Sequence, residues 1–294
     1  MIIKRLSILY KLLRVDNWTK NILIFFPCFF GKKFMDLSII YHLLIAAGIF
    51  CLLSSCAYII NDLIDAPLDR NHPDKKKRPI AANEISATNA IVILIILLLS
   101  VFVASYLLLP KLLWWLLFAY LFLNLLYSFF LKHLVIIDIF AIAIFFEIRL
   151  FYGGFAADIT ISHWLVLTTF FLASLIALGK RRDDVILQET NGMNTRTSVK
   201  HYNQIFLDTM VIITSSLLVF IYIVYSVSDW VLSNFGEYFY LSDLFVIVGL
   251  SKYLHIIFVD KQSGNPIKIL MKDRFILICV ILWALSIFYF IYYA

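Results

Sequence analysis

The chain has 294 residues, of which 63% are hydrophobic and only 15% are charged, and its formal net charge is +6 at pH 7. A soluble domain averages about 45–50% apolar and about 25% charged residues. The composition therefore excludes an ordinary soluble domain and favours a protein that crosses a membrane several times. Basic residues near the N-terminus are not followed by a short apolar core and a small-residue cleavage site, so we expect no cleavable signal peptide.

Nine apolar segments are long enough to cross the hydrocarbon of a membrane, which takes about 20 helical residues. They cover residues 18–36, 40–61, 88–109, 112–130, 134–155, 163–180, 207–227, 240–259 and 275–293. Pro110, the pair Gly153 and Gly154, and the turn at residues 264–266 interrupt this pattern between segments or near their ends. Because no internal repeat and no separate soluble part is evident, we predict an all-α membrane protein, a nine-helix bundle with residues 1–294 as its single domain.

The basic residues predict the orientation, because cytoplasmic loops carry an excess of Lys and Arg. With nine spans, the N-terminus and the loops after the second, fourth, sixth and eighth spans share one side, and this side holds most of the basic residues. The opposite side has only Lys32, Lys33 and Lys111. We therefore expect a multi-pass protein of the inner (plasma) membrane, with a cytoplasmic N-terminus and the C-terminus on the periplasmic or extracellular side. Topology thus accounts for the basic residues, and we expect no nucleic-acid partner.

Lys20 and Asn21 lie at the start of the first span. Either both contact a diphosphate, or Lys20 extends its amino group to the membrane surface. The four cysteines lie in apolar segments without metal-ligand spacing, and we interpret them as small core residues.

An acidic motif comes at the end of the second span, on the side expected to be cytoplasmic. Asp62, Asp65 and Asp69 are three and then four residues apart, so they share one face of a helix. Three carboxylates on one face repel one another unless a cation lies between them, and Mg²⁺ is typically held by one or two carboxylates together with substrate phosphates. The spacing favours a Mg²⁺–diphosphate site. The alternative is a solvated loop whose aspartates cap helices.

A basic segment follows this acidic motif directly. It either attracts anionic lipid headgroups or holds a phosphorylated substrate near the metal. Its members are Arg70, Lys75, Lys76, Lys77 and Arg78.

The fifth span contains Arg149, which is costly there, since an arginine at a helix centre costs about 2.5–3.5 kcal/mol on insertion scales. We expect this side chain to face the bundle interior and to contact a substrate phosphate or an acidic partner. Glu147 lies two positions away and points in a different direction on a helix. Asp138 is a possible partner of Lys132 or of a substrate hydroxyl. His133 fits a structural or polar contact better than a metal site, because no second His lies at ligand spacing.

The end of the sixth span mixes both charges in the sequence KRRDD, residues 180–184. A stop-transfer signal needs only the basic residues. The acidic pair, Asp183 and Asp184, therefore indicates a second metal site or carboxylates that order the two arginines.

Taken together, these motifs resemble those of the UbiA-type superfamily of intramembrane prenyltransferases over nearly the whole chain. The similar segments are RVDNWTKN at 14–21, YIINDLIDAPLDR at 58–70, HPDKKKRPIAA at 72–82, YSFFLKH at 127–133, IRLFYGG at 148–154 and GKR at 179–181. The first acidic motif specifies only the superfamily. The segments HPDKKKRPIAA, LKH and GKR together favour its polyprenyl-phosphate phosphoribosyltransferase branch.

This resemblance implies nine transmembrane helices and the transfer of 5-phosphoribose from 5-phosphoribosyl 1-diphosphate to a polyprenyl phosphate, with release of diphosphate. The product would serve cell-envelope polysaccharide synthesis. Mg²⁺ held by Asp62, Asp65 and Asp69 would neutralise the leaving group. The attacking lipid phosphate is already anionic, so no strong general base is required. KRRDD departs from the D-x-x-x-D of ordinary prenyltransferases, and Asp184 matches the acidic residue that follows the Lys-Arg pair in the phosphoribosyl branch.

The candidate residues fall into three groups. The metal candidates are Asp62, Asp65 and Asp69. The catalytic candidates are Asp62, Asp65, Asp69, Arg149, Lys180 and Asp184. The substrate-binding candidates are Lys20, Asn21, Tyr58, Asn61, Arg70, Lys75, Lys76, Arg78, Tyr127, Lys132, His133, Asp138, Arg181 and Arg182.

Two other functions stay open at this point. The first is Mg²⁺-dependent prenyl transfer from a prenyl diphosphate to an aromatic or other acceptor. The second is transport, because charged residues inside spans can mark a pathway. Homo-oligomerisation is also compatible with the sequence.

Overall fold

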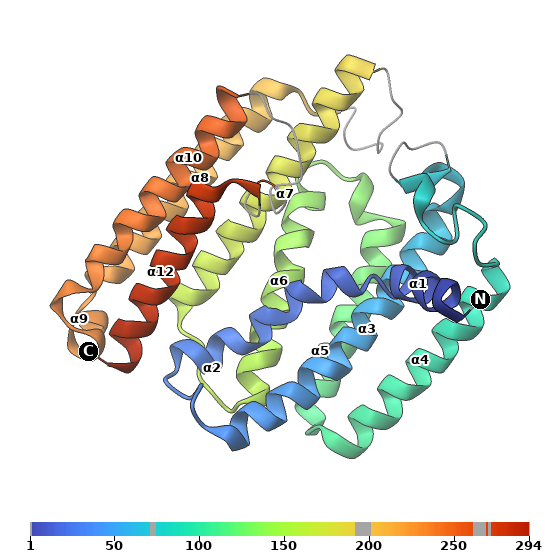
Figure 1. Ribbon diagram of the computed structural model, residues 1–294, viewed down its shortest axis with the longest axis horizontal. Coiled ribbons are helices and arrows are strands. Elements are labelled where there is room, and N and C mark those ends of the chain that lie inside the picture. The colour runs from blue at the N-terminus through green and yellow to red at the C-terminus, as the bar shows by residue number, and fades with distance from the viewer. Residues whose placement is uncertain (1, 71–74, 192–200, 261–268, 270–271, 294) are drawn as a thin grey trace. The chain divides into compact units, whose positions relative to one another are not determined.

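The computed structural model describes residues 2–70, 75–191, 201–260, 269 and 272–293. Every regular element in these residues is a helix (Figure 1), which confirms the predicted all-α class. The chain divides into two compact units. The first holds the described residues up to Lys132 together with Ile148–Ile161, and the second holds His133–Glu147 and the described residues from Ser162 onward.

Eight elements carry the first unit or link it to the second. They are α1 (Ile2–Leu13), the 3-10 helix η1 (Val15–Phe25), α2 (Phe26–Phe30), α3 (Leu37–Asp69), η2 (Lys75–Lys77), α4 (Ala87–Leu108), α5 (Lys111–Phe129) and η3 (Leu131–His133). Helix α6 (Ile137–Ala156) contributes its first half to the second unit and its second half to the first.

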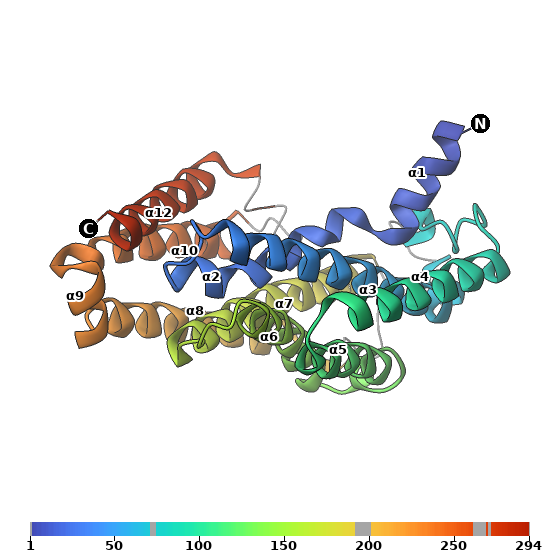
Figure 2. The ribbon, with the colours of Figure 1, turned by 90° about the horizontal axis from the view of Figure 1, so that it is seen from below.

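Six further elements build the second unit. They are α7 (His163–Asn191), α8 (Gln204–Ser226), α9 (Asp229–Phe235), η5 (Glu237–Ser242), α10 (Asp243–Phe258) and α12 (Arg274–Tyr292). Helix α7 packs along α8, and α10 packs along α12, as both views show (Figures 1 and 2). A buried apolar cluster that includes Leu178, Leu207, Val211 and Ile257 holds α7, α8 and α10 together.

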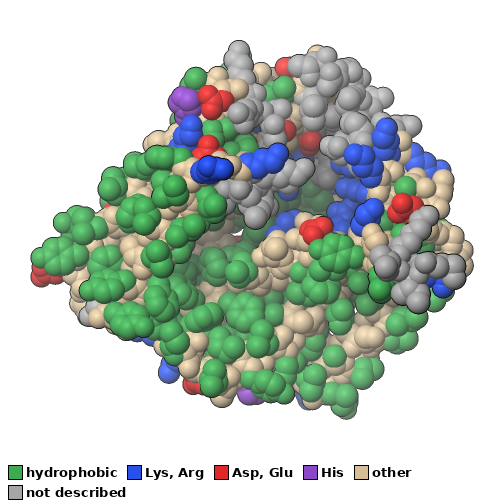
Figure 3. All heavy atoms as spheres, in the orientation of Figure 1, with side chains coloured by type: hydrophobic (Ala, Val, Ile, Leu, Met, Phe, Trp, Pro, Cys, Tyr) green, Lys and Arg blue, Asp and Glu red, His purple; other side chains and the backbone are tan. Residues whose placement is uncertain are grey.

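Eight helices in the described residues are long and apolar enough to cross a membrane. They begin and end within a few residues of eight predicted spans, except that α3 and α7 continue well beyond the predicted ends. Large apolar side chains are exposed along α4, α5 and α12, and hydrophobic side chains cover much of the face in Figure 3. Such exposed apolar surface is what a helix in contact with lipid presents.

The predicted first span, residues 18–36, is not one long helix. The 3-10 helix η1 covers its first part and the five-residue α2 follows, with Pro27 in the first turn of α2. Proline has no N–H to donate, so it interrupts the hydrogen bonds that would join the two helices. Gly31 then ends α2. The predicted count of nine spans is therefore not confirmed, and it stays a prediction together with the single membrane domain.

Helix α3 positions the acidic motif. The side chain of Asp36 caps its N-terminus by accepting the N–H groups of Ser38 and Ile39. The helix is 33 residues long, which corresponds to about 50 Å and exceeds the hydrocarbon thickness of about 30 Å. Its last turns can therefore lie at a membrane surface and carry charge. Pro67 stands inside the last turn, and the helix ends two residues later.

Gly153 lets η1 approach the second half of α6 closely. A Cβ atom at Gly153 would lie 1.9 Å from the carbonyl oxygen of Ile24, nearer than any van der Waals contact. No residue other than glycine therefore fits without movement of the backbone. This close approach places Asn21 of η1 beside Arg149, one turn before Gly153 on α6.

Candidate active site

The three aspartates of the acidic motif lie within α3, on its last three turns. Asp62 and Asp69 are buried, and Asp65 is partly exposed. Because all three belong to the helix and none precedes one, the described structure does not support the alternative in which they cap helices. Arg78 contacts both Asp62 and Asp69, so these two aspartates share a face of α3.

Asp62 and Asp69 are bound by two arginines. Arg14, which links α1 to η1, donates from Nε to Asp62 Oδ2 at 3.2 Å and pairs with Oδ1 of the same carboxylate through Nη2. Arg78 bridges the two aspartates: its Nη1 lies 3.2 Å from Asp62 Oδ1 and also pairs with Asp69 Oδ2. Burial lowers the pKa of the Arg78 guanidinium from its ordinary value, and the nearby Arg14 lowers it further, whereas the two carboxylates oppose this change.

Asp65 has its own set of partners. Lys132 Nζ of η3 lies 2.6 Å from Asp65 Oδ1, and Asn61 Nδ2 donates to Asp65 Oδ2 at 3.0 Å. Ser128 of α5 donates to Asn61 Oδ1 at 3.2 Å and thereby orients the amide. Four residues from α3, α5 and η3 thus form one hydrogen-bonded group.

The acidic motif is electrically balanced by these contacts. Three carboxylates carry three negative charges, and their cationic partners Arg14, Arg78 and Lys132 carry three positive charges. Among the described residues, no group of three or more His, Cys, Asp or Glu side chains is arranged to hold a metal ion. The donor set nevertheless fits Mg²⁺, because carboxylate oxygens are hard ligands and lie here on one helix. Mg²⁺ needs only one or two carboxylates from the protein.

The residues of the basic segment after α3 have different surroundings in the structure. Arg78 joins the acidic motif, whereas Arg70 is exposed and donates to Asn83 Oδ1 at 3.4 Å. Lys76 is exposed in η2, and Lys75 is partly buried. His72 and Pro73, which belong to the similar segment HPDKKKRPIAA, lie outside the described residues.

Arg149 is buried in the first unit, as its position in a span predicts. Its Nε donates to Asn21 Oδ1 at 2.8 Å, and its Nη2 donates to the hydroxyl of Tyr120 at 2.9 Å. The guanidinium also lies 5.3 Å from the ring centroid of Phe50. Asn21 and Tyr120 are neutral, and their hydrogen bonds orient the guanidinium.

Two further cations gather around one aromatic ring in the first unit. The guanidinium carbon of Arg14 lies 5.0 Å and Lys20 Nζ lies 5.9 Å from the ring centroid of Tyr58. The ring face attracts cations, which favours this arrangement. Tyr58 is one helical turn before Asp62, so the aromatic ring and the first carboxylate share the Arg14 side chain.

The second unit holds a separate charged cluster in the C-terminal half of α7. Arg181 Nε pairs with Asp138 Oδ2 of α6 at 2.5 Å, and Arg181 Nη1 lies 3.1 Å from Asp184 Oδ2. Arg182 Nε pairs with Asp208 Oδ1 of α8 at 2.5 Å. Of the two explanations for the acidic pair in KRRDD, the contact of Asp184 with Arg181 supports carboxylates that order the arginines.

The other candidates from the sequence differ in how far they are buried. Lys180 is partly buried in α7, Tyr127 is partly buried in α5, and His133 is exposed at the end of η3. Sequence reasoning left Asp138 as a partner of Lys132 or of a substrate hydroxyl, and its partners in the second unit are Arg181 and Tyr202.

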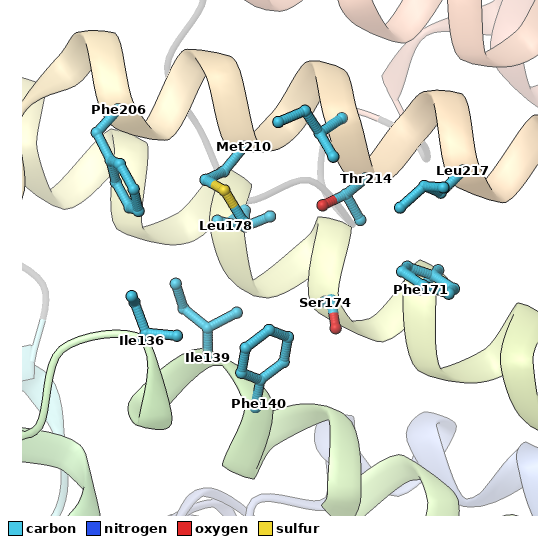
Figure 4. Close-up of a pocket in the computed structure, with 11 residues that line it drawn as sticks. Ile136, Ile139, Phe140, Phe171, Ser174, Leu178, Phe206, Met210, Thr214 and Leu217 are labelled. Atoms are coloured by element: carbon cyan, nitrogen blue, oxygen red, sulfur yellow. The ribbon is translucent and has the colours of Figure 1, made fainter.

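An apolar cavity of about 200 Å³ lies in the second unit, between α6, α7 and α8. Figure 4 shows Ile136, Ile139 and Phe140 on one side of it, facing Leu178, Phe206 and Met210 on the other. Such a lining suits a hydrocarbon chain.

Sequence reasoning missed several residues of these clusters. It did not select Arg14, Tyr120, Ser128, Tyr202 or Asp208 as site residues. Arg14 belongs to the segment RVDNWTKN, so the resemblance of this segment to the UbiA-type superfamily could have identified Arg14 as a site residue. The others are separated from their partners by 26 to 67 positions, and no local spacing points to them.

Comparison with known proteins gives a consistent picture. The model of the UbiA prenyltransferase family matches residues 24–277. The chain is 28% identical to the decaprenyl-phosphate phosphoribosyltransferase of Mycolicibacterium smegmatis, over 94% of this chain and 89% of the relative. It is 26% identical to the protein of that name in Mycobacterium tuberculosis, over 94% of this chain and 92% of the relative.

Solved structures show the same fold. A UbiA homolog from Archaeoglobus fulgidus, bound to GPP and Mg²⁺, superposes with a TM-score of 0.67 at 18% sequence identity, covering 95% of this chain and 96% of that one. A UbiA homolog from Aeropyrum pernix gives a TM-score of 0.63 at 14% identity, covering 94% and 98% of the two chains.

Proposed function

The chain belongs to the UbiA prenyltransferase family, and we propose that it transfers 5-phosphoribose from 5-phosphoribosyl 1-diphosphate to a polyprenyl phosphate, releasing diphosphate. The observation that carries this proposal is the balanced group of three aspartates and three cations at the end of α3. The phosphoribosyltransferase relatives, which match nearly the whole chain, support the choice of donor and acceptor.

The balanced group suits a diphosphate that arrives with a cation. Asp62 and Asp65, with Asp69 assisting, would hold Mg²⁺, which would supply positive charge next to the oxygens of the departing diphosphate. Arg14, Arg78 and Lys132 would then turn from the carboxylates to the phosphate oxygens. Cations placed in advance at the point where negative charge develops lower the barrier most effectively.

The donor also carries a 5-phosphate, which needs cations apart from the metal. Arg149 and Lys20 are the best candidates in the first unit, because neutral groups orient Arg149 and an aromatic ring lies beside Lys20. A guanidinium oriented in this way suits a planar, bidentate contact with a phosphate.

The acceptor supplies its own nucleophile. A lipid phosphate oxygen is anionic at neutral pH and attacks C1 of the ribose without a strong general base. The isoprenoid chain needs apolar surface, and the cavity between α6, α7 and α8 is a candidate for part of it.

Prenyl transfer is the second candidate function. The solved UbiA homolog from Archaeoglobus fulgidus is bound to GPP and Mg²⁺ and shares the fold. The sequence KRRDD argues against it here, because its described contacts join arginines to carboxylates.

A direct competition separates the two functions. The purified protein in detergent or liposomes is incubated with Mg²⁺, a polyprenyl phosphate, a phenolic acceptor, radiolabelled 5-phosphoribosyl 1-diphosphate and a prenyl diphosphate that carries a different label. We expect only the phosphoribosyl label to enter the polyprenyl-phosphate fraction. Incorporation of the prenyl label alone would refute the proposal.

The cellular setting belongs to the same proposal. The enzyme acts in the inner (plasma) membrane with its active site towards the cytoplasm, where the charged donor is soluble. The product serves the synthesis of cell-envelope polysaccharide, and the protein can act as a homo-oligomer.

A further inference from the structure

Helix α1 carries apolar side chains that the rest of the first unit does not cover. Leu6, Leu9 and Leu13 are three and then four positions apart, so they form one stripe along the helix. Leu13 packs against the buried cluster that joins α1 to α3 and α4. Leu9 is 38% and Leu6 is 60% exposed. The apolar stripe therefore begins inside the first unit and continues beyond it.

The opposite face of α1 is polar. Ser7 and Lys11 are exposed on it, because each lies two positions from Leu9, which is about half a turn around a helix. Arg5 is exposed at the edge of the apolar stripe, and α1 contains no acidic residue. One apolar face with basic residues beside it is typical of helices that lie in the surface of a membrane.

The direction of α1 agrees with such a position. Helix α3 is long and apolar enough to span a membrane, and α1 runs across it rather than along it (Figures 1 and 2). Leu12 belongs to the same buried cluster as Ala90, which lies in the first turn of the span α4. This contact places the C-terminal end of α1 at the level where α4 enters the membrane. The arrangement suits a helix that lies along the membrane surface.

The joint after α1 connects this helix to the acidic motif. Arg14 has a φ angle of 51°, a left-handed conformation that is uncommon outside glycine and persists where the surroundings enforce it. Ser55 of α3 donates to the carbonyl of Leu13 at 2.8 Å, and the Tyr10 hydroxyl donates to Asp16 Oδ1 at 2.6 Å across the joint. The Arg14 side chain binds Asp62. The direction of α1 and the place of Arg14 therefore depend on the same few residues.

We propose that α1 binds the surface of a bilayer that contains anionic lipids, on the side where α3 ends, and that this contact helps to hold Arg14 against Asp62. Leu6 and Leu9 enter the boundary between acyl chains and headgroups, and Arg5 and Lys11 attract the lipid phosphates. The charge of α1 selects this partner, because its described charged side chains are all basic. The proposal goes beyond the proposed function.

Two positions on the same helix test the contact directly. A nitroxide label is attached to Leu9→Cys or to Ser7→Cys in the full chain, in nanodiscs of phosphatidylcholine and phosphatidylglycerol. The wild type treated in the same way gives the background from the native cysteines. Electron paramagnetic resonance then measures collisions with oxygen, which concentrates in lipid, and with a nickel complex, which stays in water. We expect the Leu9 label to meet mainly oxygen and the Ser7 label to meet mainly nickel.

A second arm tests the choice of anionic lipid, and this arm rests on the proposed function. Phosphoribosyl transfer is compared in phosphatidylcholine nanodiscs with and without phosphatidylglycerol. One basic residue at an anionic surface contributes about 1 kcal/mol, which is a factor of about five in binding. We expect a higher kcat/KM with the anionic lipid, and the double variant Arg5→Gln/Lys11→Gln should lose most of this gain. Lys111→Gln is the matched control and should keep the gain, since Lys111 is exposed at the start of α5, beyond the far end of α4.

Three results would overturn the inference. A Leu9 label that meets mainly nickel would show that the stripe faces water and is open to a soluble partner. Labels shielded from both reagents and coupled to one another would show that a second copy of the chain covers α1. An activity that is independent of the anionic lipid, or a gain that the double variant keeps, would remove the role of the lipid charge. Absence of phosphoribosyl transfer in every bilayer would contradict the proposed function alone, because the label measurements do not depend on turnover.

Discussion

The aspartates of α3 are neutralised by side chains that come from three other places in the chain. Arg14 precedes η1, Arg78 follows η2, and Lys132 lies in η3. Each pair would be a poor source of stability if it were permanent, because burying two charges costs nearly as much as their attraction returns. The burial is explained if these aspartates and their basic partners exchange contacts when a charged ligand binds.

Changing the carboxylates tests their role in catalysis. Asp62→Asn and Asp65→Asn keep the side-chain size and remove the charge that binds metal. Each should reduce turnover by at least about 100-fold, comparable to the loss of one preorganised charge-stabilising group. Raising Mg²⁺ should restore part of the activity, because the defect is one of metal affinity.

Asp36→Asn is the matched control at the other end of α3, since asparagine caps a helix as well as aspartate does. It should leave turnover unchanged. Folded Asp62→Asn and Asp65→Asn proteins with near-normal turnover at limiting Mg²⁺ would show that the carboxylates have only a structural role.

The basic segment offers a graded comparison. Arg78→Ala removes a cation that bridges Asp62 and Asp69, whereas Lys76→Ala removes an exposed one. We expect Arg78→Ala to lower kcat/KM at least tenfold, because truncating one partner of a buried pair leaves the other charge uncompensated. Lys76→Ala should mainly weaken donor binding or membrane association and cost less. Steady-state kinetics of both variants give this comparison. A larger loss of kcat/KM in Lys76→Ala than in Arg78→Ala would contradict the assignment.

The sequence could predict the carboxylates of this site but not their partners. Spacing alone places Asp62, Asp65 and Asp69 on one face, because helical geometry is local. Arg14 and Lys132 lie 48 and 67 positions from the carboxylates that they bind. Their proximity follows from the packing of α1, α3 and α5, which no pattern within a short window contains.

Among the helices, the close approach of η1 to α6 depends on a single glycine. Gly153→Ala would drive a methyl group into the Ile24 carbonyl and push η1 away, so that Asn21 no longer reaches Arg149. We expect a clear fall in the thermal midpoint of unfolding and a large loss of transfer activity. Both are measured on the purified protein in detergent.

Gly48→Ala supplies the comparison for this change. Gly48 lies inside α3, and a Cβ atom there meets nothing within 4 Å. Alanine is the better helix former by about 0.5–1 kcal/mol, so this variant should be as stable as the wild type or more so. If Gly153→Ala behaved like Gly48→Ala, the close approach would have no importance.

Helix prediction succeeded where apolar length decides the outcome. The eight long helices were found because a run of about 20 apolar residues has few alternatives in a membrane. Their ends were less predictable: α3 continues to Asp69 and α7 to Asn191, since helical hydrogen bonds continue past the last apolar residue. The first span was wrong as a single helix because Pro27 acts on the backbone, which hydropathy does not report. The short α1 and α9 have too few apolar residues to be found this way.

The orientation of the chain in the membrane is a property of its loops and is tested separately. A cysteine introduced near Lys76 should resist an impermeant thiol reagent added outside intact cells, whereas one near Glu237 should react. The native cysteines Cys28, Cys56 and Cys279 are buried and should add little background. The related position near Arg196 should also be protected, although it lies outside the described residues. Labelling near Lys76 would move the proposed site to the wrong compartment.

The measurement that bears most directly on the proposed function is mass spectrometry of the lipid product. The protein is incubated with polyprenyl phosphate, 5-phosphoribosyl 1-diphosphate and Mg²⁺, with the Asp62→Asn protein and a metal-free sample as controls. We predict a new lipid whose mass equals that of the polyprenyl phosphate plus one phosphoribosyl group, formed by the wild type and lost in both controls. Unchanged polyprenyl phosphate in the wild-type sample, under conditions in which a prenyl diphosphate is consumed and its prenyl group appears on an acceptor, would contradict the account.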